Sequence, residues 1–192
     1  MIRIFDFLFS LIGLIFLSPL LILIIIIGLI DNGSPLFIQK RVGCNLKSFS
    51  LNKFRTMPIN TKSIGTHLLK DLKLTSFGYF LRRTKLDEIP QLFNVLIGDM
   101  SLVGPRPCLF NQRKLISERK KRGVFKVRPG ITGLAQILGI NMGTPTLLSK
   151  IDLKMIKKMS LFNYFYYIVK TIFLIIKKKH KNSFKKLNYI KF

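Results

Sequence analysis

A run of 24 residues without a charged side chain, from Phe7 to Ile30, constrains this chain more than any other feature. As one straight helix it would be about 36 Å long, which exceeds the roughly 30 Å hydrocarbon core of a bilayer. A cleaved secretory signal fits less well, because the run is too long, its basic start is only Arg3, and no small-residue cleavage site follows. We therefore expect a retained membrane helix.

Ser18 and Pro19 interrupt this run near its midpoint. Proline removes a backbone donor and clashes with the carbonyl of Ile15, and the Ser18 hydroxyl can bond back to the carbonyl of Leu14, so we expect a bend. Two arms of about 18 Å each could form a re-entrant hairpin, with Met1 inside the cell, or a kinked span, with Met1 outside. The residues alone favour the span, because membrane helices tolerate proline well.

The charge balance indicates an anionic partner. Of 192 residues, 33 are Lys or Arg and eight are Asp or Glu, so the formal net charge is +25. Nucleic acid, the cytoplasmic lipid leaflet and phosphorylated small molecules all fit this charge, and the apolar N-terminus favours the last two. The dense basic residues after position 39 place the main domain in the cytosol.

The two cysteines, Cys44 and Cys108, lie far apart in the sequence. They match neither a disulfide framework nor the spacing of metal ligands, which fits a reducing compartment. A buried cysteine more often acts as a small hydrophobic residue than as a catalytic thiol. We therefore assign neither cysteine a role in the chemistry.

After the apolar run, the pattern predicts a β-hairpin followed by short helices. Phe37 to Val42 form one arm, and Phe49 and Leu51 mark the alternation of the other. Later segments are expected as a surface loop at Asn60 to Thr66 and a turn and extended chain at Pro129 to Gly139. The expected helices are one or two short ones at Leu68 to Leu81, one that follows Leu86 and is ended by Gly98, and others at Leu109 to Lys121 and Leu161 to Ile176. The last helix is followed by a lysine-rich tail, which either binds an anionic lipid surface or is solvated.

Asp87 and Glu88 form the one adjacent acidic pair in the sequence, and Asp99 follows about one short helix later. Carboxylates can bind Mg2+, act as nucleophiles or accept protons, and phosphate chemistry commonly uses all three functions. A simpler interpretation is that Asp87 caps a helix and Glu88 interacts with the helix dipole. The two interpretations are compatible, because a helix N-terminus also favours phosphate.

Three arginines are candidates to bind phosphate near this acidic pair. Arg82 precedes the pair, and Arg106 and Arg128 each stand directly before a proline. The planar guanidinium can bind two phosphate oxygens at once, and a neighbouring proline restricts the backbone that carries it.

Ordered motifs decide between these interpretations. They are Ser18-Pro19, Gln39 to Gly43, Lys53 to Met57, Leu86 to Val95, Gly98 to Pro107 and Arg128 to Leu134. Together they closely resemble the bacterial sugar transferases, the small monotopic polyprenyl-phosphate phosphoglycosyl transferases. The resemblance covers essentially the whole chain, and the block from Leu86 to Pro107 is its most specific part.

The resemblance implies a mostly α fold with a small β-hairpin (α+β), in a monotopic protein with interfacial amphipathic helices. It favours the re-entrant hairpin, broken at Ser18-Pro19, over the span. The expected regions are a membrane helix at 1–33, a cytosolic catalytic domain at 34–160, and an interfacial helix with a polybasic tail at 161–192. The implied location is the bacterial inner membrane, with the catalytic domain on its cytoplasmic face.

The reaction that the resemblance implies moves a sugar 1-phosphate from a UDP-sugar to undecaprenyl phosphate, releases UMP and initiates a membrane-linked glycan. Asp87 would be the nucleophile that forms a covalent phosphosugar intermediate, and Mg2+ would bridge Asp87 and the diphosphate. Glu88 would position or deprotonate the lipid phosphate, while Arg82, Arg106 and Arg128 would hold phosphate oxygens. No nucleic acid partner is expected.

The sequence also departs from the family pattern at two places. The segment Asp71 to Thr75 lacks the usual Pro-Arg, and Ser160 to Tyr164 lacks the usual acid, so we infer no site residues there. An alternative function is a non-enzymatic, polybasic membrane adaptor that binds anionic lipid or nucleic acid. That alternative accounts for the charge but leaves the block from Leu86 to Pro107 unexplained.

Overall fold

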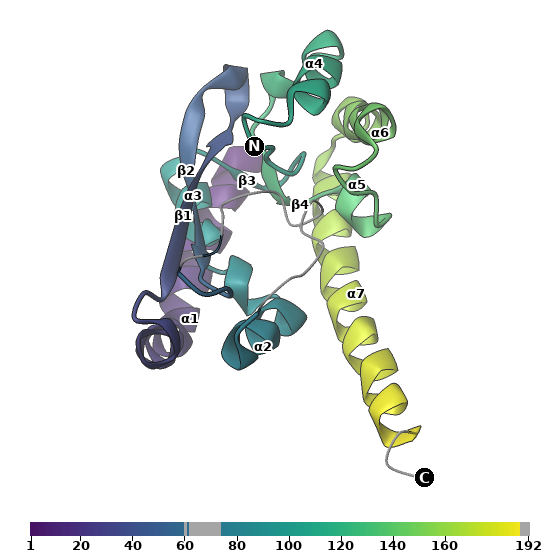
Figure 1. The fold of residues 1–192 in the computed structure, drawn as a ribbon. Coiled ribbons are helices and arrows are strands. Elements are labelled where there is room, and N and C mark those ends of the chain that lie inside the picture. Colours follow the sequence, from purple (N-terminus) through teal and green to yellow (C-terminus); the bar gives the residue numbers. More distant parts are fainter. Residues whose placement is uncertain (60, 62–73, 189–192) are drawn as a thin grey trace.

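The computed structural model describes the backbone of residues 1–59, 61 and 74–188, and the side chains of these residues up to 177. The strands are β1 (Leu36–Val42), β2 (Ser48–Phe54), β3 (Ser101–Val103) and β4 (Gly130–Thr132). The helices are α1 (Ile2–Asn32), α2 (Ser76–Thr84), α3 (Gln91–Ile97), α4 (Arg113–Lys121), α5 (Leu134–Ile137), α6 (Pro145–Lys157) and α7 (Leu161–Asn188), with short 3-10 turns η1 (Cys44–Leu46), η3 (Leu86–Glu88) and η4 (Val124–Lys126). In Figure 1 the hairpin, α1 and α3 lie on one side, and α5, α6 and α7 lie on the other.

The helix α1 contains the predicted apolar run in full. Among the described helices it is long and apolar enough to cross a membrane by length and composition, and few of its side chains are buried. Pro19 lies inside it, and the Ser18 hydroxyl donates to the carbonyl of Ile15 at 2.7 Å. The predicted acceptor, the carbonyl of Leu14, lies one residue earlier. The C-terminal turns of α1 are seen end-on in Figure 1 while its N-terminal arm runs down the page, so the helix changes direction, as a proline allows.

The predicted β-hairpin is confirmed. β1 and β2 pair in antiparallel fashion from Leu36 opposite Phe54 to Val42 opposite Ser48. Phe49 and Leu51 are buried on one face of β2, as the alternating pattern predicts.

A second, two-stranded sheet pairs β3 with β4 in parallel and was not predicted. Each strand has only three residues, which is too short to produce a readable alternation. The two backbone segments approach so closely beside this sheet that a Cβ atom at Gly130 would lie 2.0 Å from the backbone nitrogen of Gly104. The pairing therefore joins the segment that contains Arg106 to the segment that follows Arg128.

The short helices match the predictions in part. Gly98 ends α3 in a left-handed conformation, as expected, and α4 and α7 lie within or over the predicted helices. The segment 130–139 contains β4 and α5 instead of turn and extended chain only, and α6 was not predicted. Most of the predicted loop at Asn60 to Thr66, the start of the predicted helix at Leu68 to Leu81 and the side chains of the lysine-rich tail lie outside the described residues.

A buried carboxylate, Asp6, connects three elements in the interior. Its Oδ1 atom accepts hydrogen bonds from the Ser101 hydroxyl at 3.0 Å, the Leu102 backbone N–H at 2.9 Å and the Tyr164 hydroxyl at 2.9 Å. Asp6 and Tyr164 are almost fully buried. The apolar helix α1 is thereby attached to β3 and to α7 by polar contacts as well as by packing.

We predict that Asp6→Ala destabilises the protein by about 3 kcal/mol, because it leaves buried donors without an acceptor, at roughly 1–3 kcal/mol for each group. The measurement is urea unfolding of the detergent-solubilised protein. Asp31→Ala is the matched control, since Asp31 lies exposed near the end of α1. Equal losses in the two variants would contradict the role of Asp6.

Candidate active site

Glu88 is held by two cations at the end of η3. Its Oε1 atom lies 2.9 Å from Lys53 Nζ and 2.6 Å from Arg106, and its side chain is 12% exposed. Burial alone raises the pKa of Glu88, but the charges of Arg106 and Lys53 outweigh burial and hold this pKa well below its usual range. Glu88 is therefore a fixed carboxylate at neutral pH.

Asp87, the other member of the pair, has a different environment. It is buried, and its Oδ1 atom finds no hydrogen-bond partner among the described residues. Burial raises the pKa of Asp87, the Glu88 carboxylate raises it further, and Lys53 opposes both effects. Neighbouring carboxyl groups whose pKa values are pushed apart are typical of sites where the two groups have different tasks.

The alternative role of Asp87 as the cap of the following helix is not what the structure shows. Asp87 lies within the 3-10 turn η3, and the N-cap position of α3 is Pro90. The acidic pair thus precedes α3 in a separate turn. Its placement serves something other than capping this helix.

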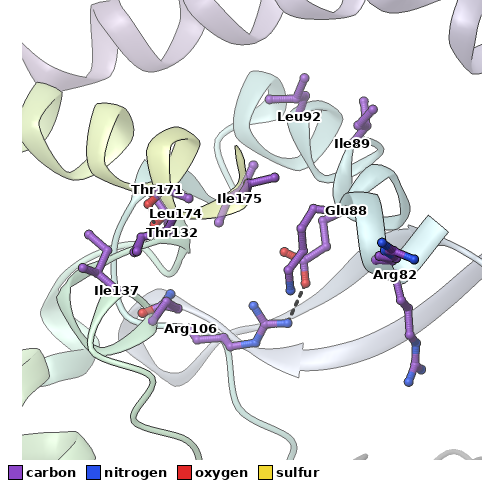
Figure 2. Close-up of a pocket in the computed structure, with 14 residues that line it drawn as sticks. Arg82, Glu88, Ile89, Leu92, Arg106, Thr132, Ile137, Thr171, Leu174 and Ile175 are labelled. Atoms are coloured by element: carbon purple, nitrogen blue, oxygen red, sulfur yellow. Dashed lines mark hydrogen bonds and ion pairs between the residues drawn. The ribbon is translucent and has the colours of Figure 1, made fainter. Parts of the chain in front are cut away.

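A cavity of about 480 Å³ lies beside Glu88, within the range of roughly 300–1,000 Å³ that is usual for small-molecule sites. Figure 2 shows Glu88 and Arg106 pointing toward each other at this cavity. Its cationic residues are Arg82, Arg83, Lys85 and Arg106. Its aliphatic residues are Ile89, Leu92, Ile131, Ile137, Leu174 and Ile175. The cavity therefore combines an anion-binding edge with an apolar wall.

Two of the three predicted arginines meet at this cavity. Arg82 lines it and donates from Nε to the Thr56 hydroxyl at 2.9 Å, and Arg106 lines it while bonded to Glu88. Arg128 does not line the cavity: its Nε donates to the carbonyl of Gly98 at 2.8 Å, at the C-terminal end of α3. Asp87 is also absent from the cavity wall, although it adjoins Glu88.

Lys53 is a site residue that we did not predict. It contacts Glu88 from β2, two residues beyond Leu51 on the buried face of that strand. A signal for it exists, because the alternation of Phe49 and Leu51 places Lys53 on the same inward face. A lysine on the core face of a strand needs an anionic partner, and Glu88 is that partner.

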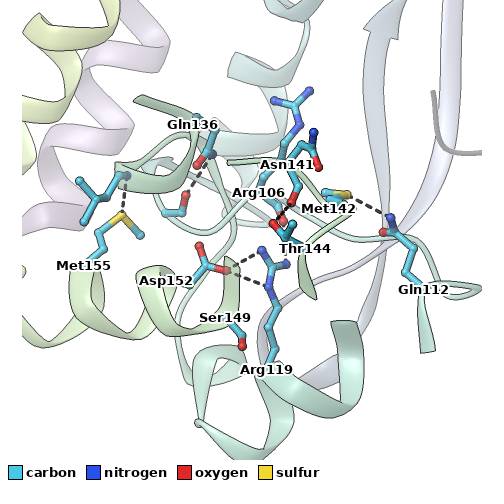
Figure 3. A network of polar contacts seen from close by, with 12 residues as sticks. Arg106, Gln112, Arg119, Gln136, Asn141, Met142, Thr144, Ser149, Asp152 and Met155 are labelled. Atoms are coloured by element: carbon cyan, nitrogen blue, oxygen red, sulfur yellow. Dashed lines mark hydrogen bonds and ion pairs between the residues drawn. The ribbon is translucent and has the colours of Figure 1, made fainter. Parts of the chain in front are cut away.

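Arg106 is supported from behind by a buried ion pair between α4 and α6, shown in Figure 3. Arg119 donates to one oxygen of Asp152 from Nε at 3.0 Å and from a terminal nitrogen at 2.7 Å. Its other terminal nitrogen donates to the backbone carbonyl of Arg106 at 2.8 Å. Both members of the pair are buried, so Arg119 holds the backbone of Arg106, whose guanidinium pairs with Glu88.

A metal site made of protein groups alone is not found in the described part of the chain, where no three His, Cys, Asp or Glu residues cluster. Mg2+, however, commonly binds one or two carboxylates together with waters and substrate phosphates. The buried, unpartnered Oδ1 atom of Asp87 fits a single carboxylate ligand of this kind.

Comparisons with known proteins agree on one family. The model of the family described as "Bacterial sugar transferase" matches residues 1–178. An uncharacterized sugar transferase, EpsL, of Bacillus subtilis is 43% identical over 140 residues, which cover 72% of this chain and 69% of the relative. The UDP-glucose:undecaprenyl-phosphate glucose-1-phosphate transferase of Klebsiella pneumoniae is 41% identical over 152 residues, 76% of this chain and 32% of the relative.

In a third relative, as in the Klebsiella protein, the matched residues cover only about a third of the relative's length. The undecaprenyl-phosphate galactose phosphotransferase of Salmonella typhimurium is 39% identical over 156 residues, 72% of this chain and 33% of the relative. The chain thus spans most of the Bacillus relative but only about a third of the other two.

We predict that Asp152→Asn costs about 3 kcal/mol of unfolding free energy, because it leaves the buried Arg119 guanidinium without its counterion. Urea unfolding in detergent measures this loss. The control is Glu118→Gln, which removes a partly buried pair to Arg122 and a pair to the exposed Lys121, both near the surface, and is expected to cost much less than Asp152→Asn. An unchanged stability of Asp152→Asn would refute the proposed support of Arg106.

Proposed function

Because the chain belongs to the bacterial sugar transferase family, we propose that it moves a sugar 1-phosphate from a UDP-sugar to undecaprenyl phosphate and releases UMP. The names of the Klebsiella and Salmonella relatives, which act on undecaprenyl phosphate, support this proposal. The observation that carries the proposal is the pair of Asp87 and Glu88. Asp87 is buried, and Glu88 is ion-paired with Lys53 and Arg106 at a cavity with a cationic edge. The product would initiate a membrane-linked polysaccharide or glycoconjugate.

In the proposed first step, a carboxylate oxygen of Asp87 attacks the phosphorus that carries the sugar. The new Asp87 oxygen–phosphorus bond forms as the bond from that phosphorus to the bridging oxygen of the diphosphate breaks, so UMP leaves with that oxygen. In the second step, an oxygen of undecaprenyl phosphate attacks the same phosphorus and releases Asp87. The product is a sugar diphosphate lipid, and the carboxylate is regenerated.

The remaining side chains suit binding rather than proton transfer. A carboxyl whose pKa is held well below its usual range is a poor base at neutral pH, so Glu88 positions Lys53 and Arg106. Arg82 and Arg106, which line the cavity, would hold phosphate oxygens. The Nε bond of Arg128 to the carbonyl of Gly98 uses one of the five donors of its guanidinium, so Arg128 stays a predicted phosphate ligand that also supports the end of α3.

Mg2+ is the proposed cofactor, and Asp87 Oδ1 would hold it together with the diphosphate oxygens. When bound, the ion would neutralise charge that otherwise repels the attacking carboxylate. The two environments in the pair agree with this division, because Glu88 is already neutralised by Lys53 and Arg106 whereas Asp87 Oδ1 has no such partner among the described residues.

The long apolar helix α1 indicates membrane association. We propose that α1 is a re-entrant hairpin bent at Ser18 and Pro19 in the bacterial inner membrane, with the catalytic part on the cytoplasmic face. The bond from Ser18 to the carbonyl of Ile15 supports the bend, because a serine hydroxyl that bonds back to a preceding carbonyl often bends a helix. In this arrangement a soluble UDP-sugar and a lipid-borne phosphate can reach one site.

We predict that Asp87→Asn abolishes turnover, because the amide is neither a nucleophile nor an anionic metal ligand. The measurement is UMP release from UDP-glucose and UDP-galactose with undecaprenyl phosphate and Mg2+. Asp31→Asn, the same change at the exposed end of α1, is expected to retain activity. Full activity of Asp87→Asn would exclude it as the nucleophile, and intact-protein mass spectrometry without lipid acceptor should show a phosphosugar adduct on wild type alone.

We predict that a single cysteine placed before Met1, with Cys44 and Cys108 replaced, reacts in intact cells with a membrane-permeant maleimide and not with an impermeant one. The reason is that a hairpin keeps both ends of α1 on the cytoplasmic side. Disruption of the cells should restore labelling by the impermeant reagent, which controls for accessibility. Labelling by the impermeant reagent in intact cells would instead establish a spanning helix.

A further inference from the structure

We infer that the apolar wall of the cavity, where Leu174 and Ile175 of α7 face Ile89 and Leu92, binds the isoprene units nearest the phosphate of the acceptor lipid. This inference rests on the proposed function and adds a location and a specificity determinant to it. Figure 2 shows the aliphatic side chains of α7 at the same cavity as Glu88 and Arg106.

The composition of the wall selects the apolar part of the acceptor over the nucleotide. Aliphatic side chains have no hydrogen-bonding groups, so a base buried against them would lose its bonds to water. The two threonines on this wall, Thr132 and Thr171, are hydrogen-bonded to each other. Gln136 donates to the carbonyl of Gly104 at 3.4 Å, and its buried Oε1 atom has no partner among the described residues. An isoprenoid chain needs no such bonds and gains from leaving water.

Charge complementarity fixes the direction of the ligand. Arg82, Arg83 and Lys85 lie at the same cavity as the aliphatic wall, together with the Arg106 cation. A ligand with an anionic head and an apolar tail matches both parts when its phosphate lies at the arginines and its first isoprene units lie along α7. The cavity, of about 480 Å³, is too small for a whole polyprenyl chain, so the remainder of the chain stays outside it.

The wall is also next to the membrane helix. Leu92 lines the cavity, and its Cδ1 atom would lie 3.2 Å from a Cβ placed on Gly13 of α1. On α7, Ile172, Phe173 and Ile176 are each more than half exposed, beside the cavity-lining Leu174 and Ile175. A lipid held near these apolar surfaces has a short path to the cavity.

The test compares Ile175→Ala with Ile176→Ala, which remove the same atoms from neighbouring positions of one helix. Ile175 lines the cavity, whereas Ile176 is 51% exposed outside it. We expect Ile175→Ala to raise KM for undecaprenyl phosphate about tenfold, from the loss of three partly buried carbon groups. Ile176→Ala is expected to leave KM unchanged, and the rate of adduct formation from the UDP-sugar alone should be unchanged in both variants.

A second measurement uses acceptors of different length. Wild type should prefer undecaprenyl phosphate to a phosphate with a single isoprene unit more strongly than Ile175→Ala does. Equal effects of the two substitutions on KM, or slower adduct formation in Ile175→Ala alone, would overturn the inference while leaving the proposed function intact. A wild-type protein that releases no UMP and forms no adduct would instead overturn the proposed function, and this inference with it.

Discussion

The attachment of α1 to the rest of the chain depends on the need to satisfy one buried carboxylate. Asp6 stands before the apolar run and accepts three hydrogen bonds. Two come from Ser101 and Leu102 of β3, and the third comes from Tyr164 of α7. An ionisable group in such a place is costly unless it is bonded, so the register of α1 against β3 is set by chemistry and not by packing alone. The strand β3 in turn pairs with β4 and leads into Arg106, which places the cation beside Glu88.

The site separates two adjacent carboxyl groups by giving them opposite surroundings. Glu88 faces two cations and stays ionised, whereas Asp87 is buried and its Oδ1 atom lacks a partner among the described residues. The separation extends outward, because Arg119 and Asp152 fix the backbone of Arg106 from the opposite side. A polybasic adaptor would have no use for this arrangement, since nonspecific attraction to anions depends on net charge and not on fixed geometry.

The features that could be predicted from the sequence are those encoded by local periodicity or by a special residue. The hairpin follows from alternation at Phe49 and Leu51, and the end of α3 follows from Gly98. The parallel pairing of β3 with β4 and the pair of Arg119 with Asp152 join residues about 30 positions apart, and no local pattern encodes such contacts. Arg128 stays a predicted phosphate ligand, and its bond to the carbonyl of Gly98 at the end of α3 is a long-range contact that its residue type alone does not indicate.

Leu92 belongs both to the cavity wall and to the contact between α3 and Gly13 of α1. The position of α1 therefore bears directly on a side chain of the cavity wall. A helix in a bilayer adjusts its tilt or depth when the thickness of the hydrocarbon core changes, at a cost of fractions of a kcal/mol per Å. In the proposed membrane placement, such an adjustment of α1 would press on or release Leu92 and would change the volume available to a ligand.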